Sequence, residues 1–399
     1  MKRVGHLIAR RSFPLELVLF GVAPLALLGW RSWLLTGNGG GGSVFRVFYQ
    51  AGRAVSEGHS PYPPATVQVI GRGGSYVYSE PFAYVFVPFT WMPYDVATVV
   101  FLIVSVVAGG IAIRLLGARD WRCYGATILT VPVFESFSLG AIGPLLLLLI
   151  AVGWRYRDRA VGGIALALAA AVKLFLWPLL VWLVLTRRLR GSVAAAATLA
   201  AVLGIWVLTD AHGLTEYPTI LRVLNDIYGA ASYSPQALAL AFGASPAGAT
   251  ALSIVIATVG VGVIFLLRRR ERDAFAAAVV ISLLATPILW MHYLVLLLVP
   301  LLLLSPSLSL WWLALVPLWA TPISPSHGER WRLLLTLTVI AVVALAPRFR
   351  RSQPPTNGVR HRLLSPRVRG RARLLAPRLD ALAVVPTHAG ASAPGARRL

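Results

Sequence analysis

The stretch GGIALALAAAVKLFLWPLLVWLVL (residues 162–185) decides the fold, because it is a continuous apolar run that carries one charge, Lys173. A run of about 20 apolar residues is long enough to cross a bilayer as a helix. An ammonium group at membrane depth costs at least about 2.5–3.5 kcal/mol, so it normally faces a polar cavity. Lys173 is about equally far from Arg159 and Arg187, and arginine is otherwise this chain's usual cation. We therefore interpret Lys173 as a candidate site residue; the alternative is an incidental lysine whose stem snorkels to water.

The composition predicts an all-α, polytopic integral membrane protein. Of its 399 residues 57% are hydrophobic and 13% are charged, whereas soluble domains carry about 25% charged residues. The first apolar stretch, residues 14–35, is too long for the core of a signal peptide, so we expect a retained first helix. Cys123 is the only cysteine, which excludes an intramolecular disulfide and a cysteine metal site. We expect no metal and no cofactor.

The formal net charge of +23 comes mainly from arginines in short loops and in the C-terminal part. This placement follows the positive-inside rule. It predicts a multi-pass protein of the plasma membrane with a cytoplasmic N-terminus. We expect residues 1–347 to form the transmembrane domain and residues 348–399 to form a disordered, basic, cytoplasmic tail that touches anionic lipid. Nucleic-acid binding by this tail is the alternative, but no nucleic-acid partner is expected.

The recurring basic clusters define how the chain is threaded through the membrane. They are residues 1–11, 114–122, 155–159, 187–190, 268–272 and 348–351. Placing all six on the cytoplasmic side gives about 10–12 crossings, at 14–35, 96–117, 125–137, 141–154, 160–172, 174–186, 192–209, 248–267, 274–289, 293–304, 308–320 and 332–346. Several of these segments are shorter than a full span, which is tolerated where protein or a cavity surrounds their ends. We expect short or re-entrant helices around a hollow that opens to the outside.

This threading gathers the unusual polar residues on the outer side. It predicts two external loops, 36–82 and 210–247, and it places Lys173 and His292 together at the outer rim. Glu135 falls at the outer end of one of the short helices. The aromatic, proline-interrupted stretch at 82–93 is typical of an interfacial or re-entrant helix, or of an ordinary aromatic belt.

Four motifs resemble one known family when they are taken in order. They are FRVFYQAGRAVSEGHSPYPP (45–64), SYVYSEPFAYVFVPFTWMP (75–93), GGIALALAAAVKLFLWPLLVWLVLTRRLRG (162–191) and WMHYLVLLLVPLLLL (290–304). Together they resemble glycosyltransferase family 87, and the resemblance covers about residues 12–347. It implies a GT-C fold and the transfer of a hexose, mannose above all, from a polyprenyl-phosphate sugar to a lipid or glycan acceptor on the outer face of a cell envelope.

The chain departs from the family pattern at three places. The resemblance implies a catalytic aspartate before the first aromatic residue of the first-loop motif, and Val44 stands there. The Gly-Gln-x-Asn motif appears here as Gly-Ala-Ile-Gly at 140–143, and the Asn-x-Ser motif as Tyr-Ser-Pro at 233–235.

The transfer chemistry assigns roles to the remaining polar residues. A leaving phosphate gathers negative charge, which fixed cations in a partly dry pocket would stabilise; we expect Lys173, Arg46 and Arg53 to bind it. A carboxylate must accept the proton of the acceptor hydroxyl; Glu80 is the first substitute for the missing aspartate and Glu57 the second. His292 would serve as a proton acceptor or a phosphate ligand. Possible sugar or acceptor contacts are Tyr49, Glu57, Tyr62, Gln236 and Trp290.

Alternatives remain open both for the roles of single residues and for the function of the chain. Glu80 and Glu57 are alternatively an ion pair with a loop arginine and a solvated loop charge, and Asp158 is a solvated ion pair. Because Val44 replaces the aspartate, the chain is alternatively a relative that binds a lipid-linked sugar or a partner without catalysis. A transporter of lipid-linked glycans is a further alternative, although transporters are expected to show internal repeats.

Overall fold

The computed structural model describes residues 13–37, 43–321 and 326–351, which form helices and no strands. The predicted all-α class is therefore confirmed. Four of these helices are long and apolar enough to cross a membrane, judged by length and composition: Phe13–Trp30, Tyr94–Leu115, Leu189–Tyr228 and Pro246–Leu267. Shorter apolar helices accompany them, so the molecule is a polytopic membrane protein.

The helices follow one another without intervening domains. In chain order they are η1 (Val18–Val22), α2 (Ala23–Gly37), α3 (Ser43–Ser56), α4 (Val67–Ile70), α5 (Glu80–Ala83), η2 (Tyr84–Phe86), α6 (Val87–Thr90), α7 (Tyr94–Leu115), α8 (Arg122–Ile128), α9 (Val131–Leu139), α10 (Gly143–Arg155), α11 (Ala160–Val172), η3 (Leu174–Leu176), α12 (Trp177–Leu185), α13 (Leu189–Tyr228), α14 (Pro235–Ala241), α15 (Pro246–Leu267), α16 (Glu271–Ala285), η4 (Met291–Leu297), α17 (Leu298–Leu304), η5 (Leu310–Ala320) and α18 (Arg330–Arg351).

The apolar run at 162–185 breaks where its charge lies. Helix α11 ends at Val172, Lys173 is extended (φ −134°, ψ 100°), and the chain resumes helically at Leu174. Pro178 lies in the first turn of α12, where a missing backbone N–H costs nothing. The predicted pair of short segments is thus present, and Lys173 occupies the break between them.

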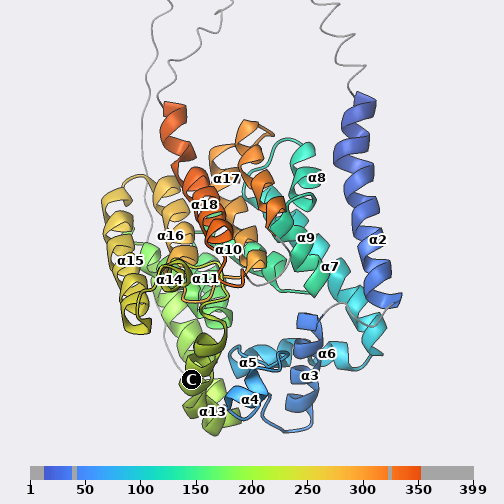
Figure 1. Cartoon of the computed structure of the whole chain (residues 1–399), viewed down its shortest axis with the longest axis vertical. Coiled ribbons are helices and arrows are strands. Elements are labelled where there is room, and N and C mark those ends of the chain that lie inside the picture. The colour runs from blue at the N-terminus through green and yellow to red at the C-terminus, as the bar shows by residue number, and fades with distance from the viewer. Residues whose placement is uncertain (1–12, 38–42, 322–325, 352–399) are drawn as a thin grey trace, which may run out of the picture. The chain divides into compact units, whose positions relative to one another are not determined.

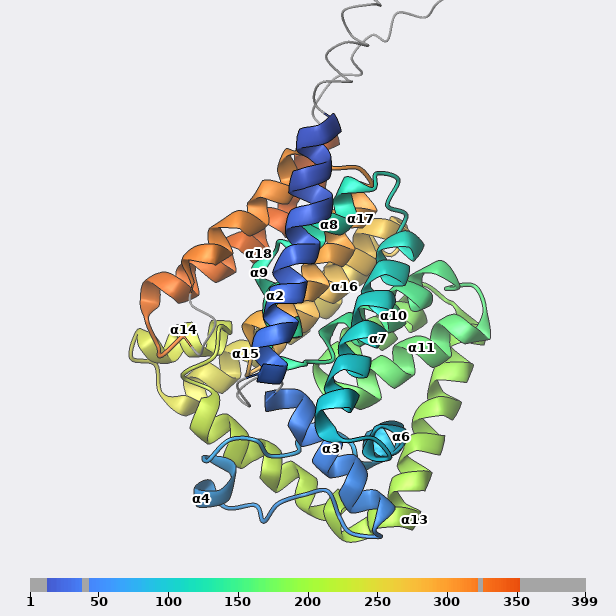
Figure 2. The same ribbon diagram turned by 90° about the vertical axis from the view of Figure 1, so that its right-hand side faces the viewer.

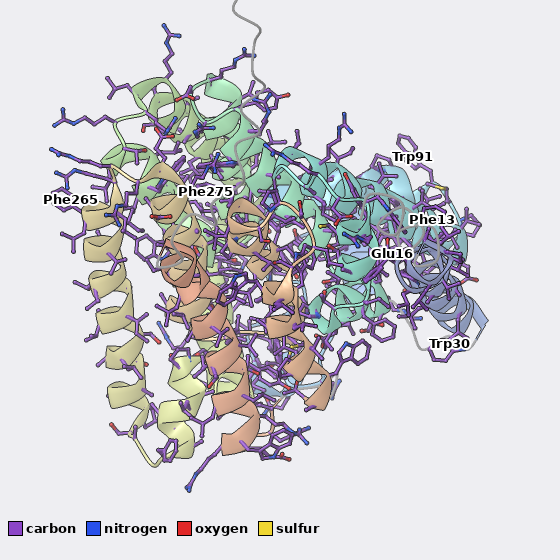
Figure 3. The ribbon with its side chains drawn as sticks, turned by 90° about the horizontal axis from the view of Figure 1, so that it is seen from above. Phe13, Glu16, Trp30, Trp91, Phe265 and Phe275 are labelled. Carbon is purple, nitrogen blue, oxygen red and sulfur yellow. The ribbon has the colours of Figure 1, made fainter. Side chains whose placement is uncertain are left out.

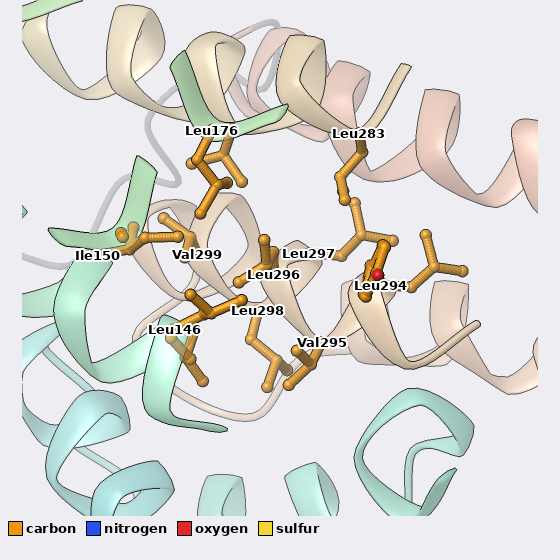
Figure 4. Close-up of a cluster of buried hydrophobic side chains, with 14 of the residues drawn as sticks. Leu146, Ile150, Leu176, Leu283, Leu294, Val295, Leu296, Leu297, Leu298 and Val299 are labelled. Carbon is orange, nitrogen blue, oxygen red and sulfur yellow. The ribbon is translucent and has the colours of Figure 1, made fainter. Parts of the chain in front are cut away.

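The centre of the molecule is the segment Met291–Leu303, in which every residue is buried. A helix that is apolar on all sides belongs in the interior of a larger assembly. Figure 4 shows Leu294, Leu296 and Leu298 surrounded by Leu146 of α10, Leu283 of α16 and neighbouring apolar side chains. This central segment carries His292 and Tyr293 at its N-terminal end.

The outer helices carry apolar side chains on the surface, as expected where lipid replaces water. Examples are Ile103 of α7, Leu208 of α13 and Leu266 of α15, all exposed. In Figure 3 Phe265 of α15 lies at the margin of the molecule, whereas the neighbouring Phe275 of α16 lies inside. Exposed apolar surface of this extent marks contact with a membrane.

Close helix packing depends on glycine. A Cβ added to Gly163 of α11 would lie 1.9 Å from the carbonyl oxygen of Gly191 in α13. Small residues let neighbouring helix backbones approach in this way in membrane proteins. The contact fixes α11, and with it the position of Lys173.

Three of the predicted cytoplasmic clusters meet through ion pairs. Arg157 contacts Glu271 at 3.2 Å, Arg188 contacts Glu271 at 2.7 Å, and Arg188 also pairs with Asp158. Asp158 is largely exposed, but its partner Arg188 is buried, so the predicted solvated pair is solvated on one side only. The clusters at 155–159, 187–190 and 268–272 therefore lie at one end of their helices, as the threading requires.

The segment between α2 and α7 forms a layer of short helices. Helix α3 packs on η2 and α6, and α4 and α5 pack on α13. Figure 1 shows α4 and α5 next to α13, and Figure 2 shows the layer from a second side. Residues 82–93 contribute η2 and α6, which are too short to span. The two predicted external loops, 36–82 and 210–247, therefore contact each other through helices.

Some sequence-based predictions fall outside the described residues. The basic cluster at 1–11, the glycine run at 39–42 and the tail from residue 352 onward belong to these parts of the chain. Within the described part, α18 continues to Arg351, so the helix runs a few residues past the predicted domain end at 347.

Candidate active site

A cavity of about 700 Å³ lies between the layer of short helices, the second half of α13 and the central segment. Such a volume is typical of a small-molecule site. Its walls are mostly apolar and carry few charged groups. Residues that matter for the chemistry are Val44 of α3, Tyr78, Glu135 of α9, Lys173, Tyr217 and Asn225 of α13, Trp290, His292 and Tyr293.

Lys173 reaches this cavity from the break between α11 and η3, and it is only 8% exposed. Its Nζ donates a hydrogen bond of 2.6 Å to the hydroxyl of Tyr293. The same nitrogen lies 3.9 Å from the centre of the Tyr78 ring and 4.7 Å from that of Tyr293. Aromatic faces stabilise a cation without neutralising it. The Lys173 amine is therefore held in place at the cavity wall, where an anionic ligand can reach it.

His292 lies on the same cavity at the start of the central segment. Its ring meets the Tyr293 ring edge to face at 4.6 Å, and its Nδ1 is buried without a hydrogen-bond partner. Trp290, which lines the cavity, is extended and precedes η4. Trp290, His292 and Tyr293 thus line the cavity from one short stretch of chain, and the Tyr293 ring also stacks on Phe175.

Glu135 is the carboxylate of the cavity lining. It is 5% exposed, and its Oε2 has no hydrogen-bond partner. Helix α9 fixes it: Pro132 lies in the first turn, and Gly140 ends the helix in the left-handed conformation (φ 62°), which glycine adopts without strain. Val44, which we expect at the position of the family's aspartate, lines the same cavity.

Glu80 does not line this cavity, although it is 1% exposed. Its Oε2 accepts a hydrogen bond of 2.7 Å from Thr209 of α13. The next residue, Asp210, has non-helical angles inside α13 (φ −150°, ψ 70°) and accepts hydrogen bonds from Ser60 and from the backbone N–H of Gly213. We call this set, Ser60, Glu80, Thr209, Asp210 and Gly213, the Asp210 junction.

Burial raises the pKa of the Glu80 carboxyl above its usual 4.5, and hydrogen bonds from Thr209 and Tyr84 counteract part of that effect. Desolvation disfavours the charged form of an acid, whereas donors to the carboxylate favour it. The junction joins the first loop to the kink of α13. That Glu80 is the catalytic base remains a prediction. In the structure its carboxyl group is hydrogen-bonded within the protein.

The first-loop cations also lie outside the cavity lining. Arg46 places its guanidinium 5.0 Å from the centre of the Tyr94 ring. Arg53 is exposed and pairs with Glu57 at 2.8 Å, one helical turn away. An exposed pair of this kind contributes little to stability. The structure thus separates Arg46, Arg53 and Glu57 from Lys173, and their predicted roles in binding or proton transfer stay untested.

The other predicted contact residues have internal partners. The Tyr49 hydroxyl donates to the carbonyl of Met92, and the Tyr62 hydroxyl donates to the carbonyl of Tyr78. Gln236 is buried and donates to the side chain of Asn225, a residue of the cavity lining. Tyr49, Tyr62 and Gln236 therefore surround or support the lining, whereas Trp290 belongs to it.

The sequence-based set of site residues omitted Glu135, Tyr78 and Tyr293. Glu135 had the same signal as Lys173, a lone charge inside an apolar segment, VPVFESFSL. Tyr78 and Tyr293 were inconspicuous because tyrosine is common near membrane interfaces. Among the described residues, no group of three or more His, Cys, Asp or Glu side chains is arranged to hold a metal ion.

Comparison of the sequence with known protein families identifies the family of this chain. The model of glycosyltransferase family 87 matches residues 76–290, which is more than half of the chain. The chain belongs to glycosyltransferase family 87. The match includes Tyr78, Glu135 and Lys173, and ends directly before the central segment. No curated protein and no solved structure matches the chain. Family 87 membership and the apolar helices together make this protein a membrane glycosyltransferase.

Proposed function

We propose that this family 87 glycosyltransferase takes a hexose, with mannose as the first sugar to test, from a polyprenyl-phosphate donor. The acceptor is a hydroxyl of a lipid or glycan at the outer face of the plasma membrane, and the N-terminus and C-terminal tail are cytoplasmic. Hexosyl transfer of this kind belongs to the building of a cell envelope. Arabinose is the second donor sugar to test.

The observation that carries this proposal is the buried ammonium of Lys173 at the wall of a largely apolar cavity. A polyprenyl-phosphate sugar combines one anionic phosphodiester with an apolar chain, and both parts fit such a site. When the bond from the sugar to the phosphate breaks, the phosphate gains charge. A fixed cation in a low-dielectric pocket stabilises that charge more strongly than water does.

The aromatic lining supports a sugar ligand. Tyr78, Tyr217 and Trp290 present ring faces or edges to the cavity, and Asn225 supplies an amide. Cavities for small ligands combine such apolar walls with a small number of orienting polar groups. The hexose would lie between these groups, with its phosphate toward Lys173.

A second candidate function is binding without catalysis. It is favoured by one observation, the apolar Val44 in the cavity lining where the family resemblance implies an aspartate. Such a protein would hold a lipid-linked sugar, or present it to a partner enzyme, and would form no glycosidic bond.

One experiment separates these functions. The purified full-length protein in lipid nanodiscs is incubated with radiolabelled polyprenyl-phosphate mannose, glucose or arabinose and with octyl α-mannoside as the acceptor probe. Formation of a labelled disaccharide glycoside from a hexose donor supports the transferase. Saturable donor binding without a new glycosidic bond supports the binding protein and contradicts the transferase. In a separate assay with the protein in liposomes, movement of donor across the bilayer without a new glycosidic bond would instead indicate a transporter.

A further inference from the structure

Two buried carboxylates occur in the described part of the chain, and their surroundings differ. Glu80 accepts a hydrogen bond from Thr209, whereas Glu135 has no ion pair and its Oε2 has no hydrogen-bond partner. A buried carboxylate without partners costs several kcal/mol in the folded state. Groups retained at such a cost are candidates for function, because packing and stability do not explain them.

Glu135 is held firmly, so its placement is part of the fold. Helix α9 is buried along almost its whole length and packs against η4. The neighbouring Ser136 hydroxyl lies 3.4 Å from the carbonyl oxygen of His292 and also donates to Pro132. A Cβ on Gly143 would lie 2.8 Å from the Ser136 hydroxyl, so α9 and the start of α10 pack closely at this point. The carboxylate is therefore fixed relative to the central segment.

The cavity contains a second unpartnered polar atom, the Nδ1 of His292. Glu135 and His292 come from neighbouring elements, and both line the space that Lys173 reaches. In the described structure no ion pair joins Glu135 to Lys173, so the carboxylate and the ammonium occupy separate positions around that space. This is the arrangement that a ligand with a phosphate at one end and a reacting hydroxyl at the other would fill.

We propose that Glu135 is the general base of the transfer reaction; this inference depends on the transferase function proposed above. The Glu135 carboxylate takes the proton of the acceptor hydroxyl. The acceptor oxygen forms a bond to the anomeric carbon of the donor sugar, while the bond from that carbon to the phosphate oxygen breaks. The electron pair of the broken bond leaves with the polyprenyl phosphate, next to the Lys173 ammonium. The products are the glycosylated acceptor, polyprenyl phosphate and a protonated Glu135.

Glu135 suits this role better than Glu80 for two reasons. A general base must come within hydrogen-bond reach of the proton that it accepts, and Glu135 lines the cavity whereas Glu80 does not. The Glu80 oxygen that faces Thr209 already accepts a hydrogen bond. Accepting a substrate proton there would require the Asp210 junction to open.

The test measures turnover and donor binding separately, in the nanodisc assay with polyprenyl-phosphate mannose and octyl α-mannoside. For Glu135→Gln we expect turnover to fall at least 100-fold, since a positioned base contributes about 10²–10⁴-fold. The dissociation constant of the donor, followed by tryptophan fluorescence, should stay within about threefold of wild type because the variant preserves size and the Lys173 environment. Asp95→Asn, an exposed carboxylate in the first turn of α7, is the matched control and should transfer at the wild-type rate.

A rescue variant distinguishes a lost base from a damaged fold. Val44 lines the same cavity, so Val44→Asp in the Glu135→Gln background offers the acceptor a new carboxylate. Recovery of at least tenfold in turnover supports the proposal. Turnover of Glu135→Gln at the wild-type rate overturns it and leaves the transferase function intact. Parallel loss of donor binding and turnover, without rescue, also overturns it, because Glu135 is then structural. Donor binding by the wild-type protein without any transfer overturns the transferase function and this inference together.

Discussion

The cavity cluster, formed by Glu135, Lys173, His292 and Tyr293, differs from the Asp210 junction in how its polar groups are satisfied. At the junction, Ser60 donates to Asp210, Thr209 donates to Glu80, and the backbone of Gly213 donates to Asp210. In the cavity cluster one carboxylate oxygen and one imidazole nitrogen lack partners. Both regions place charged groups in an apolar protein.

The difference shows how a charged group that stabilises the fold can be distinguished, in this molecule, from one that is a candidate for catalysis. Hydrogen bonds inside the junction offset part of its desolvation, and they join the first loop to the kink of α13. The proposal assigns partners in a bound substrate to the unsatisfied atoms of the cavity cluster, since a buried polar atom without a partner is costly. Burial alone does not separate the two regions, since Glu80 is even less exposed than Glu135.

The largest effect that would sharpen this comparison is expected for Lys173→Ala. Removing the cation that faces the leaving phosphate should lower turnover about 10²–10³-fold, the range typical of losing one preorganised donor to a developing oxyanion. The rate of labelled product formation measures it. Lys2→Ala, which removes the other lysine of the chain, is the matched control and should have no effect. Wild-type turnover in Lys173→Ala would show that the reaction does not depend on the cation at this cavity.

A smaller loss is expected for Tyr293→Phe. The variant keeps the ring under the ammonium but deletes the hydroxyl that accepts the Lys173 hydrogen bond of 2.6 Å. Because hydrogen bonds to charged groups contribute about 1.5–3 kcal/mol, we expect turnover to fall roughly 10- to 150-fold. Tyr156→Phe, at the far end of α10, is the control. An unchanged rate in Tyr293→Phe would show that the aromatic faces alone position the ammonium.

At the junction, Glu80→Gln should keep transfer within about threefold of wild type and should change how stability depends on pH. Burial raises the pKa of this carboxyl in the folded protein above 4.5, so the folded state binds the proton more tightly than the unfolded state does. The contribution of Glu80 to stability therefore improves as pH falls through the raised pKa toward 4.5, and worsens as pH rises.

The measurement is the melting temperature of both proteins in nanodiscs between about pH 7 and pH 4.5. The wild type should gain stability relative to Glu80→Gln as the pH is lowered. A loss of stability of the wild type relative to Glu80→Gln at low pH would contradict the raised pKa of Glu80. Loss of transfer in Glu80→Gln at neutral pH would instead make Glu80 the candidate general base.

The smallest effect is expected for Ser60→Ala, which removes one exposed hydrogen bond of the junction, 2.6 Å long. We expect a loss of about 0.5–1.5 kcal/mol, seen as faster proteolysis of the first loop. Ser56→Ala, whose hydroxyl only donates to the nearby carbonyl of Arg53, controls for the loss of a serine hydroxyl. Equal proteolysis of the two variants would show that the Ser60 contact does not hold the loop.

Much of the fold could be predicted because it depends on local composition. Apolar length set the helices, and the break at Lys173 appeared as the gap between the predicted segments 160–172 and 174–186. The pairs Arg157–Glu271 and Arg188–Asp158 connect clusters that the charge rule had assigned to one side. These features follow from the cost of taking backbone groups and charges out of water, which acts on each segment separately.

The candidate site was predictable in part. Lys173 and His292 were expected at one place, and both line the cavity; Glu80, Arg46 and Arg53 were expected there too, and they do not. Helices α4 and α5 have four residues each, too few for a periodicity that would say which charged side chain turns inward, and they pack on α13. Glu135 was visible as a lone acid in an apolar helix, but its missing partners were not.

The sequence by itself determined that this chain is a helical membrane protein, where its helices break, and that a lysine is buried at one break. These features depend on hydropathy and charge, which set how each segment interacts with water and lipid. They can therefore be predicted without knowing which segments become neighbours in the fold. Only the tertiary structure decided which carboxylate is satisfied and which is left open. That distinction depends on Thr209 meeting Glu80 across 129 residues of chain and on the absence of any such partner for Glu135 among the described residues. Hydrogen-bond partners that come from distant segments leave no pattern in the sequence of either one.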